Sequence, residues 1–410
     1  MNIVSKDILH PCTSCGGCAA VCPANAIVMV LNEQGFYRPV LDVDKCVDCS
    51  LCTKVCYKYD DVKPYNIAEH KEILMLACQA RDNATLNTTT SGGIAYLLAK
   101  ALYRQGYKCI GVVYDTLDDS AKHVCAADEK DIEYFKGSKY IQSMTYPTFK
   151  RMLDKEEKRE KTVLFGTPCQ IYAVDKFLKR INRRNDFLLV DIYCHGCPSL
   201  KIWHKYVQEI KKLIKKPRFD HVNFRSKIKG WGNFVVEVIV DDLQVFISDR
   251  KKDEFYQLFF SNLMLNEACH DCALRSTLEY TDIRLGDFWG KCYDTDIKGV
   301  SGVTLVTERG KQAFDFIRKE TTVKEHDWTD FLPYQSWNVD YQIDKKIRNH
   351  LFAMLPDKSL KEIQDYYFAH QSFSQFIKRY IKKIIFLFSP RFINRVKKMY
   401  HQIHVFLIFF

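Results

Sequence analysis

Cysteine is the residue type in this chain best suited to chemistry, with 17 copies among 410 residues. Eight of them lie near the N-terminus in two runs with the same spacing, C-x2-C-x2-C-x3-C. The chain starts without the apolar core of a signal peptide, so we expect a cytoplasmic protein. In that compartment, clustered thiols indicate metal binding rather than disulfide bonds.

The spacing of each run is typical of bacterial ferredoxins that bind two [4Fe-4S] clusters. Three thiolates of a run hold three irons of one cluster, and the fourth reaches the other cluster because it cannot bend back. The pattern predicts one cluster on Cys12, Cys15, Cys18 and Cys56, and a second on Cys46, Cys49, Cys52 and Cys22. A structural zinc ion, the main alternative, favours two C-x2-C pairs around one ion. Residues 26–42, between the runs, predict a β-hairpin that turns near Gly35.

The central region alternates between apolar strands and helical patterns. Strands are predicted at 72–80, 107–115, 162–166 and 187–193, and helices at 94–106, 171–181 and 200–214. This order predicts an α/β domain with right-handed βαβ units and a parallel sheet. Ligands of such sheets bind beyond the carboxyl ends of the strands, where Thr90–Gly93, Gly166–Gln170 and Cys194–Ser199 would lie. No G-x-G-x-x-G occurs, which excludes a standard Rossmann dinucleotide site.

Four further cysteines predict a third metal site. Cys169 and Cys194 each follow a predicted strand at this rim, and Cys269-His270-Asp271-Cys272 adds a C-x2-C pair. Four thiolates suit either a third [4Fe-4S] cluster or a structural zinc ion, and the residues alone leave both open. Cys197 lies near enough to Cys194 to serve as an alternative ligand. We expect His195 and His270 to orient the ligands rather than to act as bases.

Six segments that follow one another along the chain indicate a family. They are TSGGIAYLLAKAL, KGSKYIQS, LFGTPCQIYAVDKFL, DIYCHGCPS, VNFRSKIKGW and DIRLGDFWG. Together they resemble the coenzyme F420 hydrogenase/dehydrogenase beta-subunit family over about residues 8–320, in the form that has a ferredoxin module fused in front. The resemblance implies an FAD site of non-Rossmann type beside an iron–sulfur cluster, and favours a cluster at the third site.

The resemblance also implies which residues hold the flavin. They are Ser91, Gly92, Gly93, Ser138, Lys139, Tyr140, Thr167 and Gln170. Arg225 and Lys227 would face an anionic ligand, or would form a solvated strand edge. Asp287 is either a proton relay or a turn residue. No catalytic residue is assigned.

Electron counting suggests an oxidoreductase or its electron-transfer subunit. Clusters pass single electrons, nicotinamides and deazaflavins exchange two as hydride, and a flavin does both. The two-electron partner would be coenzyme F420, as in archaeal members of the family, or another small carrier, and the one-electron partner a redox protein. The alternatives are a redox protein of bacterial polysaccharide assembly, which uses no F420, and a non-catalytic electron carrier.

We therefore expect a mixed α+β protein of three parts. A two-cluster ferredoxin module would occupy residues 1–64, a flavin and iron–sulfur α/β domain 65–325, and a C-terminal extension 326–410. Residues 374–404 predict two amphipathic helices, and the eight basic residues after Asp365 meet no acidic one. This pattern suits the anionic inner surface of a membrane, or a helical hairpin packed on the core. Continuous apolar faces argue against nucleic acid.

Overall fold

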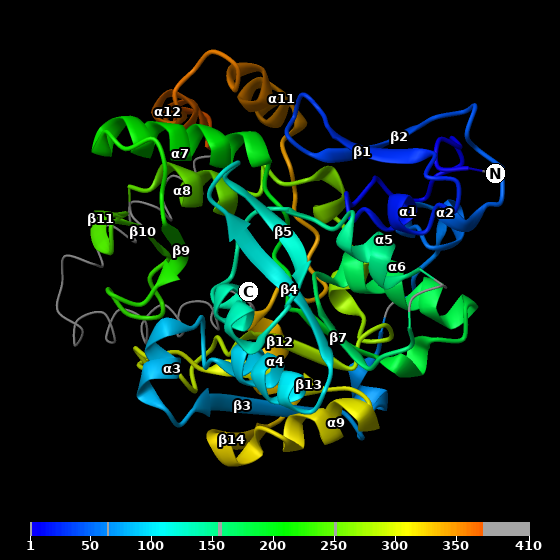
Figure 1. The fold of residues 1–410 in the computed structure, drawn as a ribbon. Coiled ribbons are helices and arrows are strands. Elements are labelled where there is room, and N and C mark those ends of the chain that lie inside the picture. The colour runs from blue at the N-terminus through cyan, green and yellow to red at the C-terminus, as the bar shows by residue number, and fades with distance from the viewer. Residues whose placement is uncertain (1, 64, 155–157, 250–251, 372–410) are drawn as a thin grey trace, which may run out of the picture. The chain divides into compact units, whose positions relative to one another are not determined.

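A computed structural model describes residues 2–63, 65–154, 158–249 and 252–371 (Figure 1). The chain divides into two compact units, Met1–Asp344 and Lys345–Phe410. The predicted amphipathic helices of 374–404 lie outside the described residues. Among the helices that the structure describes, none is long and apolar enough to cross a membrane.

The N-terminal part of the first unit is a small module of two short helices and a hairpin. Helix α1 (Gly17–Ala20) lies in the first cysteine run, and α2 (Leu51–Lys54) lies in the second. Strands β1 (Ile27–Leu31) and β2 (Tyr37–Leu41) pair antiparallel in register, from Ile27 opposite Leu41 to Leu31 opposite Tyr37. Gly35 takes a φ of 81° at the turn, where a side chain would be strained. The predicted hairpin is confirmed.

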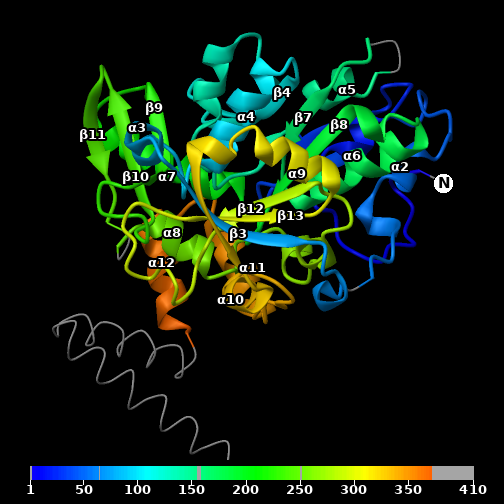
Figure 2. The same cartoon turned by 90° about the horizontal axis from the view of Figure 1, so that it is seen from below.

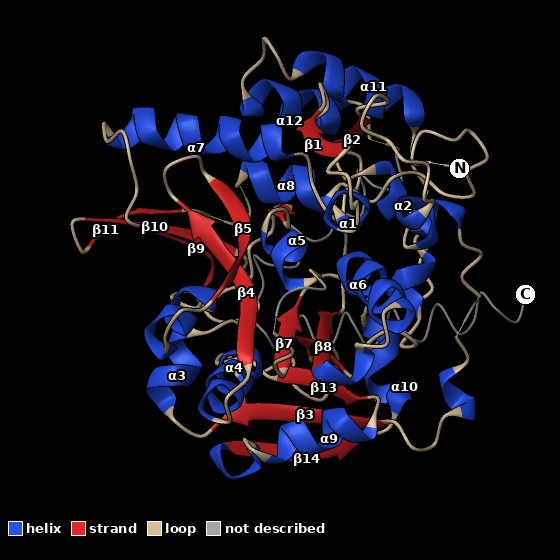
Figure 3. Cartoon of the chain, turned by 45° about the vertical axis from the view of Figure 1, so that its right-hand side comes forward, coloured by secondary structure: helices blue, strands red, loops and turns tan. Residues whose placement is uncertain are grey.

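A large mixed sheet forms the centre of the first unit, with strand order β14-β3-β13-β12-β8-β7-β4-β5-β6 in the described residues (Figure 3). Its strands are β3 (Leu74–Ala80), β4 (Lys108–Asp115), β5 (Ser120–Cys125), β6 (Ser143–Met144), β7 (Thr162–Phe165), β8 (Phe187–Ile192), β12 (Ile283–Asp287), β13 (Ser301–Leu305) and β14 (Thr321–His326). The neighbours β12, β8, β7 and β4 run parallel. The predicted α/β class is confirmed, with a mixed rather than a purely parallel sheet.

The first predicted βαβ unit differs from the expectation. Strands β3 and β4 form where predicted, but β3 pairs antiparallel with β13 and β14 and lies several strands away from β4. These partner strands are distant in sequence, so no local pattern predicts the pairing. The expected loop 81–93 also contains α3 (Asn83–Thr88), whose first turn is capped by the side chain of Asp82.

Helices cover both faces of the large sheet. Alternate strand residues point to opposite faces, so Cys109 packs with α4 (Ile94–Arg104) and α9 (Glu308–Asp315), whereas Ile110 packs with α6 (Pro168–Arg180). Helix α5 (Thr148–Met152) joins α6, since its Phe149 belongs to the same core cluster as Ile110. These packed helices fix the loops at the carboxyl ends of the strands.

Three antiparallel strands, β9 (His221–Ser226), β10 (Val235–Val240) and β11 (Leu243–Ile247), form a separate sheet seen beside the large one in Figure 2. Aromatic contacts join it to helices α7 (Leu200–Ile214) and α8 (Glu254–Phe260), with Trp203 stacked on Phe224 at 4.3 Å. Ser199 is the N-cap residue of α7, but its side chain makes no capping hydrogen bond. Its hydroxyl instead donates to the carbonyl of Gln34 in the hairpin turn at 2.6 Å.

Helix α10 (Trp328–Phe331) is the last described α-helix of the first unit, and a 3-10 helix (Leu332–Tyr334) follows it. The described part of the second unit consists of α11 (Lys345–Met354) and α12 (Leu360–Ala369). Ser359 and Glu362 form a reciprocal cap at the start of α12, which fixes where that helix begins.

Candidate iron–sulfur centres and the cofactor rim

The two cysteine runs share an unusual backbone conformation. Ser14 and Asp48 lie between the first and second cysteines of their runs, with φ of 63° and 46°. Gly16 and Ser50 follow the second cysteines, with φ of 75° and 62°. Such left-handed turns curl the chain so that backbone N–H groups can point at sulfur, as the N–H of Ser14 does toward Cys12 Sγ at 3.4 Å.

We call Cys12, Cys15, Cys18 and Cys56 the inner set. Burial raises the pKa of Cys18 well above the usual value, and the neighbouring thiolate charges of Cys15, Cys56 and Cys12 raise it further. The pKa of Cys56 is likewise raised by burial and then by the charge of Cys15. Although Cys56 belongs to the second run, its charge acts on Cys18 of the first run, and the ligand assignment stays a prediction.

We call Cys22, Cys46, Cys49 and Cys52 the outer set. Burial raises the pKa of Cys52, and the charges of Cys49 and Cys22 add to it. Cys22 and Cys52 are buried, whereas Cys46 is partly exposed and Cys49 is exposed. The outer set therefore reaches the protein surface.

The third set consists of five thiols: Cys169, Cys194, Cys197, Cys269 and Cys272. Cys169 lies in the first turn of α6, and Cys194 and Cys197 lie in the loop after β8. That loop runs beside the segment that carries Cys269, because Asn266 N–H donates to Cys197 O at 2.8 Å and Pro198 pairs with Leu265. Gly196 has a φ of 148°, a conformation that L side chains rarely adopt, and a Cβ there would lie 2.7 Å from Leu265 Cδ1.

Mutual charge effects indicate that these thiols lie near one another. Burial raises the pKa of Cys269 well above the usual value, and the charges of Cys197, Cys194 and Cys272 raise it further. Burial likewise raises the pKa of Cys169, as do the charges of Cys15 and Cys194. Cys197, which the sequence offered as an alternative ligand, lies in the same place, and its N–H points to Cys269 Sγ at 3.4 Å.

Thiolates of this set could hold a [4Fe-4S] cluster or a zinc ion, and the third cluster stays a prediction. A cationic side chain also has an unpaired donor here: Arg275 is buried, and its Nε has no hydrogen-bond partner. The charge of Arg275 lowers the pKa of Cys194 and Cys272, but burial raises the pKa of both thiols by more.

Tyr57 fills the space between the inner and third sets. It follows Cys56, is buried, and its hydroxyl accepts the N–H of Ala273, beside Cys272, at 3.1 Å. A cluster of buried apolar side chains around Tyr57 and Tyr172 also contacts Cys15, Cys169 and Cys272. The inner set is thus the one that adjoins the third set. The usual residue at position 57 in such runs is proline, and no sequence pattern indicated this role for tyrosine.

Polar contacts join the module to the α/β part of the first unit. Ser14, between two inner-set cysteines, accepts hydrogen bonds from Asn266 Nδ2 at 2.9 Å and from Arg38 Nη1 at 2.5 Å. Arg38 also donates to Asn266 Oδ1 at 3.3 Å. The hydroxyl of Thr145 donates to the carbonyl of Cys15 at 3.0 Å. Asn266 is fully buried, so these contacts hold the inner set in a fixed place.

The TSGG segment at the predicted flavin site is held by its own neighbours. The hydroxyl of Ser91 donates to Val300 O at 2.7 Å, and the N–H of Gly92 donates to Ser301 Oγ at 2.9 Å. A Cβ on Gly92 would overlap the carbonyl of Cys78, and Gly93 starts α4 with a φ of 82°. At α6, the N–H of Thr167 donates to Gln170 Oε1 at 2.9 Å.

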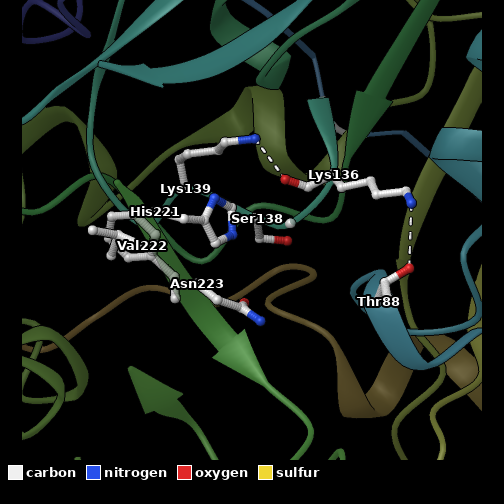
Figure 4. Close-up of a pocket in the computed structure, with 9 residues that line it drawn as sticks. Thr88, Lys136, Ser138, Lys139, His221, Val222 and Asn223 are labelled. Carbon is white, nitrogen blue, oxygen red and sulfur yellow. Dashed lines mark hydrogen bonds between the residues drawn. The ribbon is translucent and has the colours of Figure 1, made fainter. Parts of the chain in front are cut away.

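Ser138 and Lys139 line a small pocket with Lys136, His221 and Asn223 (Figure 4). The amine of Lys139 donates to three backbone carbonyls, of Tyr134, Phe135 and Lys136, at 3.0, 3.2 and 2.7 Å. Burial lowers the pKa of Lys139 to about 7. The cavity volume of about 20 Å³ is far below the ~300–1,000 Å³ of cofactor pockets. The pocket in this conformation does not fit a flavin.

Arg225 and Lys227 have internal partners. Arg225 is buried and donates to Tyr140 OH at 2.7 Å and to Asp287 Oδ2 at 3.1 Å. Asp287 also accepts from Trp231 Nε1 at 2.8 Å. Lys227 donates to the carbonyls of Leu86 and Ser91, both at 2.5 Å, and burial lowers its pKa to about 8. The roles predicted for both residues toward a ligand stay predictions.

His195 and His270 bind the loops of the third set. His195 Nε2 lies 2.7 Å from Asn262 Oδ1, and His270 Nε2 lies 3.2 Å from Asn262 O. Burial lowers the pKa of His195 to about 4. Arg275, which no sequence motif singled out, donates to His195 O at 3.1 Å and to Val339 O at 2.7 Å. These residues position the cysteine loops.

Comparisons with known proteins match both halves of this arrangement. Residues 159–330 match the family described as the carboxyl-terminal part of the beta subunit of coenzyme F420 hydrogenase/dehydrogenase, and residues 11–58 match the 4Fe-4S dicluster domain. One of the subunits of the F(420)H(2) dehydrogenase of Methanosarcina mazei is 22% identical over 334 residues, which cover 79% of this chain and 86% of the relative.

Two further proteins also match more than half of this chain. The beta subunit of the coenzyme F420 hydrogenase of Methanococcus voltae is 25% identical over 247 residues, 57% of this chain and 81% of the relative. A chain of the F420-reducing [NiFe] hydrogenase complex from Methanosarcina barkeri covers 71% of this chain and 91% of its own, with a TM-score of 0.44 and 18% identity.

Proposed function

We propose that this chain is the electron-transfer subunit of a larger redox complex. It belongs to the coenzyme F420 hydrogenase/dehydrogenase beta-subunit family and carries a 4Fe-4S dicluster domain in front. In the proposal, clusters on the outer, inner and third sets pass single electrons between a partner protein and a two-electron carrier. The relatives named as subunits of F420-dependent enzymes support such a partner and point to coenzyme F420 as that carrier.

The observation that carries the proposal is the order of the three sets. The charge of Cys15 acts on Cys169, and Tyr57 spans from Cys56 to the backbone beside Cys272. The cluster around Tyr57 that contacts Cys15, Cys169 and Cys272 includes no described cysteine of the outer set, and Cys49 of the outer set is exposed. This order supports an entry or exit point for electrons at the outer set and an internal end at the third set.

A flavin at the rim is the finer part of the proposal. FAD, when bound, exchanges single electrons with clusters and electron pairs with a hydride carrier. The support is the family resemblance and the need for such a junction, and the pocket beside Lys139 contributes none. Flavin released from anaerobically purified protein, measured by fluorescence, tests this part. About one FAD per chain would support a flavin at the junction. If all clusters are present and FAD is absent, the chain is a one-electron carrier instead.

Iron counting tests the cluster proposal. The full chain, purified without oxygen, should hold about twelve irons for three cubanes. The double variant Cys269→Ser/Cys272→Ser should lose about four, while Cys125→Ser, a thiol outside the sets, should lose none. Eight irons and one zinc in the unaltered chain would refute the third cluster. Cys197→Ser shows whether the fifth thiol is also a ligand.

A membrane-surface role for residues 374–404 is a separate proposal. Its support is their sequence alone, with eight cationic residues opposite apolar stripes. A partner complex at a membrane would be compatible with such a tail.

A further inference from the structure

A cysteine outside the three sets lies beside a histidine and an aspartate. Cys292 is in the loop after β12, His326 is the last residue of β14, and Asp330 lies in α10. One ligand atom from each, the sulfur, a ring nitrogen and a carboxylate oxygen, lies within 4.8 Å of the other two. Three segments that are distant in sequence thus bring three different metal-ligating side chains together.

The imidazole is oriented before any metal arrives. His326 Nδ1 lies 3.0 Å from Asp330 Oδ2, and its Nε2 lies 2.9 Å from the hydroxyl of Tyr293. Phe288 packs against the ring at 4.7 Å, and the side chain of His326 is 4% exposed. Nδ1 is therefore the nitrogen on the side of the carboxylate, while Nε2–H can donate to Tyr293. Ligating histidines commonly donate their second N–H in this way.

Cys292 and Asp330 leave the site open on one side. Cys292 is exposed, and the side chain of Asp330 is 48% exposed. The open side would admit a water molecule as a fourth ligand.

We propose that Cys292, His326 and Asp330 form a zinc site, with His326 bound through Nδ1. A thiolate, an imidazole and a carboxylate are the donor types that zinc takes, at ~2.0–2.3 Å. Such bonds place the ligand atoms ~3.3–3.8 Å apart in a tetrahedron, which small side-chain movements reach from the present separations. The ion would fasten the loop after β12 to β14 and α10. That loop carries Trp289, stacked on Trp231 at 4.6 Å, so the site would stiffen the rim.

This inference does not depend on the proposed function, because its ligands lie outside the three cysteine sets. The test uses the full chain with its clusters, freed of loose metal by a chelator. Iodoacetamide labelling of Cys292 is followed by peptide mass spectrometry with and without added Zn²⁺. One equivalent of Zn²⁺ should slow labelling about tenfold or more, because a coordinated thiolate is shielded. An unchanged labelling rate would overturn the proposal.

Two variants sharpen the test. His326→Gln should lose the protection, whereas His70→Gln should keep it. His70 forms the same kind of histidine–carboxylate pair, with Nδ1 3.0 Å from Glu72 Oε1. It is not a ligand of the proposed site and therefore serves as the control. If His326→Gln folds poorly, Cys292→Ser replaces it: this exposed substitution should lower the zinc content after gel filtration from one ion to none at unchanged iron. Protection that survives His326→Gln, or zinc that survives Cys292→Ser, would refute the site.

Discussion

The inner and outer cysteine sets have the same spacing and the same left-handed turns, yet they face different surroundings. The inner set is packed against the α/β part of the first unit through Ser14, Tyr57 and Thr145. The outer set ends at the surface with Cys49 exposed. A repeated motif therefore specifies the local ligand geometry twice, and the packing around each copy separates an internal site from a surface site.

Exchanging equivalent residues of the two cysteine runs should reveal the largest difference between the inner and outer sets. Gly16 and Ser50 occupy the same position of the two runs, but a Cβ on Gly16 would overlap the hydroxyl of Thr145. Gly16→Ser should lower the free energy of unfolding by about 2–5 kcal/mol, from overpacking and left-handed strain. Ser50→Gly should leave it unchanged or raise it by about 1 kcal/mol. Anaerobic denaturant titrations compare the two, and equal effects would contradict the difference in packing.

Arg275 distinguishes the third set from the other two. Arg275→Gln removes a buried charge and a free N–H donor beside the thiolates. The reduction potential of the third cluster should fall by about 60–130 mV, equivalent to the ~1.5–3 kcal/mol of a charge-assisted hydrogen bond. Potentiometric titration followed by electron paramagnetic resonance (EPR) measures it. Arg183→Gln, at another buried arginine, should leave the potential unchanged. A shift of the same size there would refute a specific role for Arg275.

Tyr57 tests the contact between the inner and third sets. Tyr57→Phe keeps the ring but loses the hydrogen bond to the N–H of Ala273. We expect a loss of about 1 kcal/mol in the free energy of unfolding with unchanged iron content. Tyr59→Phe, whose hydroxyl bonds within the module to Ile3 O, is the matched control for iron content. Loss of iron from Tyr57→Phe alone would mean that this hydroxyl supports a cluster.

Much of the local structure was predictable because it depends on short-range pattern. Apolar runs predicted β3, β4, β7 and β8, and the residues between the cysteine runs predicted the hairpin of β1 and β2. The antiparallel pairing of β13 and β14 with β3 was not predictable, since it depends on contacts more than 200 residues apart in sequence. The same holds for Arg275 and Arg38, whose roles arise only when distant loops meet.

The smallest effect on the chemistry is expected from the C-terminal tail. Ending the chain at Gln371 removes all eight basic residues that follow Asp365. The shortened chain should lose binding to anionic vesicles, because each basic group near the surface contributes ~1 kcal/mol to the binding free energy. This contribution should fall as the salt concentration rises. Iron and flavin content should not change. Equal vesicle binding by both chains in sedimentation would refute the membrane-surface proposal.

The central claim, that the inner rather than the outer set adjoins the third, is tested most directly by EPR of fully reduced protein. Magnetic coupling between neighbouring reduced clusters broadens and splits their signals. Removal of the outer cluster by Cys46→Ser/Cys49→Ser should leave the third cluster coupled to a neighbour. Removal of the inner cluster by Cys15→Ser/Cys18→Ser, confirmed by iron content, should leave the third cluster with an uncoupled signal. Coupling that disappears with the outer cluster and survives loss of the inner one would contradict the account.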